Sequence, residues 1–258
     1  MFCIANLNNT SKVSQAIRNT QQVFVAKYGN RNAVPDRFWL LTLLLPDKEA
    51  RILDIGPNIY VFQDLIADHQ REKYRYHSMD LQHNNLGEWA TESVHDANQD
   101  PYPFPDETFD LVIATDVIEH IQNTDIFLKN VHRLLAPDGQ VLITTPNYGS
   151  IGSVLKIFQG KMFHDPLGTE IDRYCFQEHV KYFTLNNFLP YLSFNKIFPS
   201  HVIRHGFHTY LPFTGNSFVK RLLVQYLYNR LISLGNRFCP ELVIIAGKKE
   251  TSIQFISV

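Results

Sequence analysis

Cysteine is scarce in this chain of 258 residues, and the three that occur, Cys3, Cys175 and Cys239, are far apart. No CxxC pair is present, and an odd number of cysteines argues against a disulfide framework. The first residues also lack the basic segment and apolar stretch that mark a secretory signal. We therefore expect a protein of the reducing cytoplasm.

Long hydrophobic runs are lacking as well. The longest, residues 38–45, is interrupted by Thr42 and is far shorter than the ~20 apolar residues that cross a bilayer. The net charge is only -1, so the overall charge gives no reason to expect a nucleic-acid partner. Hydrophobic residues nevertheless make up 45% of the chain, which is enough for the full core of one large domain.

Short apolar runs alternate with amphipathic segments along the chain. The run at 109–116 shows little polar alternation, as expected of a parallel strand covered on both faces. The alternation predicts an α/β fold with a parallel sheet. We expect strands at 51–56, 74–80, 93–97, 109–116, 140–146 and 241–249, and helices at 10–29, 37–45, 61–68 and 124–139. Residues 147–240 are too many for a loop and should hold helices, one more strand and a substrate cap.

Acidic residues stand at the ends of successive predicted strands. Asp54 precedes Gly56 at the end of the first, Asp80 ends the second, Asp96 the third and Asp116 the fourth. The carboxyl ends of parallel strands meet at one edge of the sheet, where ligands bind. Glycine allows close approach of the backbone, and helix N-terminal amides favour a carboxylate. A single Asp could merely cap a helix or turn, but the series favours a cofactor site.

At this point the chain resembles class I S-adenosylmethionine (SAM)-dependent methyltransferases, especially the type 11 group. The resemblance is carried by ILDIG (52–56), MDLQ (79–82), the segment 95–121 that ends in Glu-His-Ile, LLAPDGQVLITTPN (134–147) and EHVKYFT (178–184). It implies a Rossmann-like fold, with a doubly wound, mostly parallel seven-stranded sheet, an antiparallel last strand and a helical cap. It also implies SAM as the cofactor.

The resemblance also implies a place for each matched residue along the cofactor. Asp54, Gly56 and Asn58 would line its methionine end. Asp80 and Leu81 would hold the ribose and the adenine edge, and Asp96 and Ala97 the adenine amine. Thr115, Asp116 and Val117 would form the floor under the sulfonium.

The turn after Gly56 departs from the family pattern, which has glycines two and four residues later. Asn58 and Tyr60 stand there instead. Asn tolerates positive φ, whereas the Tyr60 ring would crowd the helix start or lie over the ligand. The departure puts the affinity for SAM in question, though not the fold.

Histidines supply the candidate catalytic groups. An acceptor hydroxyl benefits from a general base, for which His120 and His179 are the first candidates and Asp116 the third. Orientation of the acceptor alone could also suffice. The acceptor is expected to be an oxygen or nitrogen of a small-molecule, sugar or lipid-linked compound. We expect no metal site, because no carboxylate or cysteine completes a ligand set with His201 and His205.

Two alternative functions remain open on the sequence. A nicotinamide-dependent oxidoreductase would need glycines at 56, 58 and 61, but only Gly56 is present. A non-catalytic binding protein with a methyltransferase-like scaffold and a degenerate cofactor turn is the other alternative, because a fold alone does not give a function.

We divide the chain into an N-terminal helical segment (1–47), a SAM-binding core (48–147), a cap with the sixth strand (148–240) and a last strand with a tail (241–258), together one structural domain.

The charges are unevenly distributed along the chain. Residues 179–240 contain no acid, but they hold seven bases: Lys181, Lys196, Arg204, Lys220, Arg221, Arg230 and Arg237. An anionic acceptor would explain this. A predicted helix at 216–234 either packs on the sheet or lies peripherally on the inner membrane surface. The sequence does not give the oligomeric state.

Overall fold

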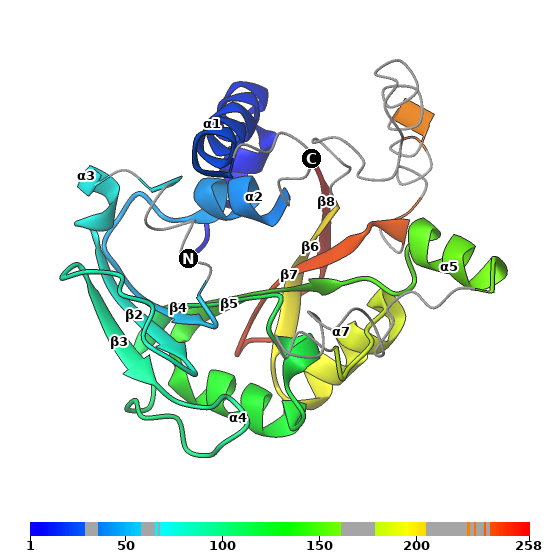
Figure 1. Cartoon of the computed structure of the whole chain (residues 1–258). Coiled ribbons are helices and arrows are strands. Elements are labelled where there is room, and N and C mark those ends of the chain that lie inside the picture. The colour runs from blue at the N-terminus through cyan, green and yellow to red at the C-terminus, as the bar shows by residue number, and fades with distance from the viewer. Residues whose placement is uncertain are drawn as a thin grey trace.

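In the computed structural model, eight strands of the described residues form one sheet with helices on both faces (Figure 1). The structure describes residues 1–28, 36–57, 65–66, 68–160, 179–204, 226–227, 230, 235 and 238–258. The strands are β1 (Ala50–Ile55), β2 (Tyr74–Asp80), β3 (Ala90–Val94), β4 (Phe109–Thr115), β5 (Leu135–Pro146), β6 (Phe198–Arg204), β7 (Glu241–Gly247) and β8 (Gln254–Ser257).

The strand order is β3-β2-β1-β4-β5-β7-β6-β8. Strands β1 to β5 are parallel, β7 is antiparallel to both β5 and β6, and β8 runs parallel to β6. The predicted fold class is therefore confirmed, and the sheet has one strand, β8, beyond the seven expected. The chain runs outward from β1 to β3 and then returns to the other side of β1 with β4. That reversal creates the crevice in which open α/β sheets bind ligands.

The helices divide between the two faces of the sheet. The α1–α2 pair covers one face and α4 and α7 lie on the other (Figure 1). The bounds are η1 (Ile4–Asn8), α1 (Thr10–Tyr28), α2 (Asp36–Leu44), α3 (Asp68–Arg71), η3 (Ile118–His120), α4 (Thr124–Leu134), α5 (Ile151–Phe158) and α7 (Leu185–Phe194).

Strand β4 shows why its sequence is almost continuously apolar. Leu111 and Ile113 belong to the core cluster that includes α2, whereas Val112 and Ala114 belong to the cluster that includes α4 and α7. Successive strand residues point to opposite faces, and both faces are covered here. Every one of these four side chains is therefore buried.

Two predicted boundaries are wrong. The third strand ends at Val94 and not at Ala97, so Asp96 lies in the following loop. The segment 124–139 was predicted as a helix closed by a Pro-Asp-Gly turn; the helix ends at Leu134, and residues 135–139 already belong to β5, where its ladder with β4 is irregular. A Cβ on Gly139 would lie 2.8 Å from the carbonyl oxygen of Phe109. This close approach explains why the Pro-Asp-Gly sequence ends in glycine.

The described residues between 147 and 240 include the helices α5 and α7 and the strand β6, in agreement with the helices and further strand that were predicted for this segment. The helix predicted at 216–234 and most of the one predicted at 61–68 lie outside the described residues, as do Asn58 and Tyr60. Within the described part of the chain, we find no helix whose length and hydrophobicity would allow it to cross a membrane.

Candidate active site

Gly56 brings the end of β1 against the end of β4. Its φ is +60°, a conformation that glycine adopts readily, and its N–H donates to the Met79 carbonyl of β2 at 2.9 Å. A Cβ at this position would lie only 2.8 Å from Cγ2 of Val117. The turns after β1 and β4 can therefore touch only because residue 56 has no side chain.

Asp54, just before this turn, is a buried acid. Its side chain is 2% exposed, and Oδ2 accepts a hydrogen bond from the Tyr76 hydroxyl at 2.8 Å. Oδ1 has no hydrogen-bond partner among the described residues. Burial raises the pKa of Asp54 to about 7; the Tyr76 hydrogen bond opposes the rise and the Asp80 charge adds to it. A buried, incompletely satisfied carboxylate fits an ammonium donor such as the methionine end of SAM.

Tyr76 is itself held in place by aromatic packing. Its ring stacks on Trp89 with centroids 4.8 Å apart, and the Arg71 guanidinium lies over Trp89 at 5.5 Å. The sequence analysis did not single out Tyr76 or Trp89. The available signal was a tyrosine within strand β2, which pairs with the strand that carries Asp54 near its end.

Asp80 ends β2 at the same edge and also shapes its own loop. Its carboxylate accepts from the Leu81 N–H at 2.6 Å and from Nδ2 of Asn84 at 3.0 Å. An ionised carboxylate has about four acceptor positions, so two more bonds, such as those from ribose hydroxyls, can be accommodated. Leu81 is 70% exposed beside it.

Asp96 and Ala97 lie in the loop after β3. Oδ1 of Asp96 accepts from the N–H of Asn98 at 2.9 Å and from its Nδ2 at 3.0 Å, and the Ala97 carbonyl accepts from the Tyr102 hydroxyl at 2.8 Å. These bonds fix the loop. They are compatible with the adenine-side position expected for Asp96, but also with a purely local role.

Asp116 follows β4 in a left-handed conformation, with φ +54°. Its N–H donates to the Thr144 carbonyl at 3.1 Å, and the Thr144 hydroxyl donates to Oδ1 of Asp116 at 2.9 Å. Thr115 before it is buried, and Val117 after it caps η3. Strand β5 thus fixes this acid through Thr144, a residue that the sequence analysis missed.

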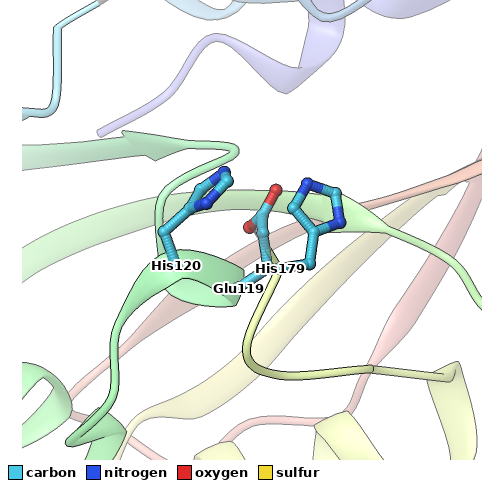
Figure 2. A group of neighbouring side chains, drawn as sticks. All are labelled: Glu119, His120 and His179. Atoms are coloured by element: carbon cyan, nitrogen blue, oxygen red, sulfur yellow. The ribbon is translucent and has the colours of Figure 1, made fainter. Parts of the chain in front are cut away.

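The structure brings the predicted candidates His120 and His179 together around Glu119 (Figure 2). The two imidazole rings are edge to face, with centroids 4.8 Å apart. The Glu119 carbonyl accepts from Val180 at 2.8 Å and from Lys181 at 3.0 Å, which docks the His179 segment on η3. We call Glu119, His120 and His179 the Glu-His-His cluster. Glu119 was not predicted as a site residue, although an acid inside the apolar run DVIEHI was a signal.

Glu119 is completely buried, and neither carboxylate oxygen has a hydrogen-bond partner among the described residues. Burial, and then the charge of Asp116, hold the pKa of Glu119 well above its usual range. The nearby Thr145 hydroxyl opposes this rise through an interaction whose geometry is too poor for a hydrogen bond. The carboxylate therefore needs either a proton or a cation.

Tyr148 lies on the other side of His179. Its hydroxyl is hydrogen-bonded to Nδ1 of His179, and its ring meets Tyr182 edge to face at 4.8 Å. Burial raises the pKa of Tyr148, so the phenol stays protonated. Tyr148, which follows β5, and Tyr182 thus form an aromatic border to the Glu-His-His cluster.

Comparison with known proteins agrees with this geometry. A protein-family model described as a methyltransferase domain matches residues 29–192, more than half of the chain. The mitochondrial ubiquinone biosynthesis O-methyltransferase of Rattus norvegicus is 39% identical over 51 residues, 20% of this chain and 15% of that protein. A protein of Mycolicibacterium smegmatis, described as an S-adenosylmethionine-dependent methyltransferase, is 34% identical over 110 residues, 37% of this chain and 38% of the relative.

These matches span well under half of each relative's length. Other relatives carry the names of N- and C-methyltransferases, so the relatives do not agree on an acceptor atom. A solved structure from Bacillus halodurans, described as a methyltransferase, has a TM-score of 0.51 at 16% identity and covers 83% of this chain and 98% of that one. That likeness shows the shared fold.

The matched region contains the strand-end acids and both histidines of the cluster. A nicotinamide-dependent oxidoreductase is therefore less consistent with the findings than a methyltransferase. The chain belongs to the methyltransferase domain family.

Proposed function

We propose that this enzyme methylates an oxygen or nitrogen of a small-molecule acceptor, which binds beside the Glu-His-His cluster. One observation supports the proposal above the others. The close approach of Gly56 to Val117 places the end of β1, which carries Asp54, beside the turn that leads into η3 and its histidine. A cofactor at the first turn and an acceptor at the second would then be neighbours, as methyl transfer requires.

The first three strands would hold the cofactor. Oδ1 of Asp54 is suited to an ammonium group, Asp80 to ribose hydroxyls and Asp96 to an exocyclic amine. Gly56 with Asn58, Leu81 with Ala97, and Thr115 with Asp116 and Val117 would complete the contacts. When bound, SAM supplies a methyl group that is already electrophilic, so the residues of the chain have to orient it and keep competing water away.

The Glu-His-His cluster and Asp116 would act on the acceptor. A hydroxyl or ammonium acceptor must lose a proton before or during its attack. His120 and His179 are partly exposed, and each has a ring nitrogen within 4.8 Å of the Glu119 carboxylate. Tyr148 fixes the orientation of His179 through Nδ1. The pair is thus placed to take that proton, with Asp116 as the third candidate.

The experiment that tests this function has two stages. Calorimetry should first detect binding of SAM and S-adenosylhomocysteine. Labelled SAM is then incubated with hydroxyl and amine acceptors, neutral and anionic. His120→Ala or His179→Ala should lower turnover roughly 100-fold with SAM affinity preserved, and His132→Ala on α4 serves as the control. Absence of SAM binding would refute the proposal, whereas unchanged turnover in both variants would leave orientation alone as the mechanism.

The acceptor and the location of the enzyme are further parts of the proposal. The seven bases and the absence of acids in residues 179–240 favour an anionic acceptor, such as a lipid-linked one. We place the enzyme in the cytoplasm, with peripheral contact to the inner membrane surface through residues 216–234. No nucleic-acid partner is proposed.

A further inference from the structure

We propose that the Glu-His-His cluster binds a divalent transition-metal ion, which activates an acceptor hydroxyl for methylation. One donor atom each from Glu119, His120 and His179 all lie within 4.8 Å of one another. Figure 2 shows the carboxylate between the two imidazole rings, with ring nitrogens of both histidines on the same side as its oxygens. The role of the ion rests on the proposed function, but the binding site does not.

The carboxylate of Glu119 is the main argument for a cation. It is 0% exposed, and neither oxygen has a hydrogen-bond partner among the described residues. Burying an ionised carboxylate without a partner is very unfavourable. A divalent cation would compensate this buried charge.

Tyr148 gives a second, independent argument. Its hydroxyl is hydrogen-bonded to Nδ1 of His179, so Nε2 is the nitrogen that would bind an ion. Histidine ligands commonly have their second ring nitrogen fixed in this way by a hydrogen bond, which sets the tautomer and the ring orientation. The Val180 and Lys181 amides, bonded to the Glu119 carbonyl, hold the His179 segment in place.

The donor set selects the class of ion. Two imidazoles and one carboxylate suit Zn²⁺, Mn²⁺, Fe²⁺ or Co²⁺, whereas Mg²⁺ and Ca²⁺ prefer oxygen ligands alone. Ligand bonds of about 2.0–2.2 Å bring donor atoms to within roughly 3–4 Å of one another. Small rotations of the partly exposed imidazoles close the remaining gap. Three protein ligands leave a position open, as in catalytic sites.

A hydroxyl at that position would be acidified by the ion. His120 and His179 would then be ligands and not bases, and Asp116 would accept the hydroxyl proton. An electron pair of the acceptor oxygen forms the bond to the methyl carbon. The carbon–sulfur bond of SAM breaks at the same time, and the electrons of that bond stay on sulfur. The products are a methyl ether, S-adenosylhomocysteine and one proton, which Asp116 holds.

Metal binding is tested without any acceptor. The whole protein, stripped with a chelator, is titrated with Zn²⁺ by calorimetry and with Co²⁺ by visible absorption. We expect one equivalent to bind, with d–d bands from Co²⁺. Glu119→Gln and His179→Ala should abolish this equivalent, and Tyr148→Phe should weaken it roughly 10- to 100-fold. His201→Ala and Cys239→Ser are the controls.

The outcomes separate this inference from the proposed function. No equivalent bound, or one that persists in both Glu119→Gln and His179→Ala, would overturn the metal site. Methyl transfer by stripped protein would overturn the role of the ion and leave the proposed function standing. Metal binding with no transfer to any acceptor would support the site and count against the function. Circular dichroism and SAM binding show whether each variant is folded.

Discussion

The Tyr76 hydroxyl donates a 2.8 Å hydrogen bond to Oδ2 of Asp54 in the core between β1 and β2. This bond opposes the effect of burial on the Asp54 pKa and leaves Oδ1 as the oxygen available to a ligand. The Tyr76–Asp54 pair is therefore expected to decide how well the cofactor's ammonium group is bound.

Tyr76→Phe should weaken SAM binding about 10- to 100-fold at pH 7, because a hydrogen bond to a charged group contributes about 1.5–3 kcal/mol. The ring and its stacking on Trp89 are retained. Tyr74→Phe on the same strand, β2, is the matched control, since it removes a buried hydrogen bond to the carbonyl of Pro46. Calorimetry with SAM checks both variants, and equal losses of affinity would contradict the role given to Asp54.

SAM binding should release a proton in mildly acidic solution. With a pKa of about 7, Asp54 is mostly protonated in the free protein at pH 6, and pairing with an ammonium group requires it to ionise. Calorimetry at pH 6 in buffers of different ionisation enthalpy should show this release. It should vanish at pH 8.5 and in Asp54→Asn. Release of the same size in that variant would assign the proton to another group.

The same pKa makes a prediction about stability. The folded value of about 7 lies above the ordinary 3.8, so ionisation of Asp54 opposes folding. The stability that its protonated form contributes is complete below about pH 4 and is lost as the pH rises through 7. Asp54→Asn should flatten this part of the stability curve in urea titrations between pH 5 and 8. An unchanged slope would mean that Asp54 is ionised throughout.

Asp80→Ala should abolish detectable SAM binding, as expected for the loss of two charge-assisted bonds. The structure adds a cost to folding of about 1 kcal/mol, because the carboxylate also holds Leu81 and Asn84. Asp110→Ala is the control. Asp110 lies near the start of β4, at the opposite end from the site, and its carboxylate accepts a hydrogen bond from the Arg51 N–H. The melting temperature of this variant should therefore fall while its SAM affinity stays the same.

Gly56→Ala should be severe for two separable reasons. A positive φ costs a side-chain-bearing residue about 1–2 kcal/mol, and the new Cβ would meet Val117 at 2.8 Å. Adding Val117→Ala removes the clash but not the backbone strain. The double variant should therefore recover part of the lost stability in thermal melts. Full recovery would show that strain is negligible, and no recovery would show that the Val117 side chain yields without cost.

The base-rich part of the chain predicts salt-sensitive binding to anionic vesicles. Each base near such a surface contributes about 1 kcal/mol, so Lys220→Glu, Arg221→Glu and Arg230→Glu together should prevent flotation with liposomes. The control is a variant in which Lys12, Lys48 and Lys73 are each changed to Glu, which alters the net charge equally outside the base-rich segment. If the protein does not float even at low salt, the membrane contact is refuted and an anionic small molecule remains.

The strand-end acids could be predicted because they depend only on strand periodicity and on the parallel order of β1, β2 and β4. Asp96 was placed less well, since a strand end is a local detail of hydrogen bonding. Tyr76, Thr144 and Glu119 were missed because each acts through a partner on another element. The metal prediction relied on spacing along the chain, whereas Glu119 and His179 come from distant segments. The roles of Asn58 and Tyr60 stay predictions.

Pro146 and Glu241 face each other in the last pair of the β5–β7 ladder, and just beyond them Asn147 donates to the carbonyls of Pro240 and Cys239. The two ends of the segment 147–240 thus lie side by side and are joined by hydrogen bonds at the edge of the β5–β7 ladder. In evolutionary terms, insertions and substitutions between these two ends can accumulate without shifting the register of β4 and β5. Strand β6 is the exception, because it belongs to the sheet. Related proteins could therefore change their acceptor many times during evolution while they keep the same cofactor-binding site.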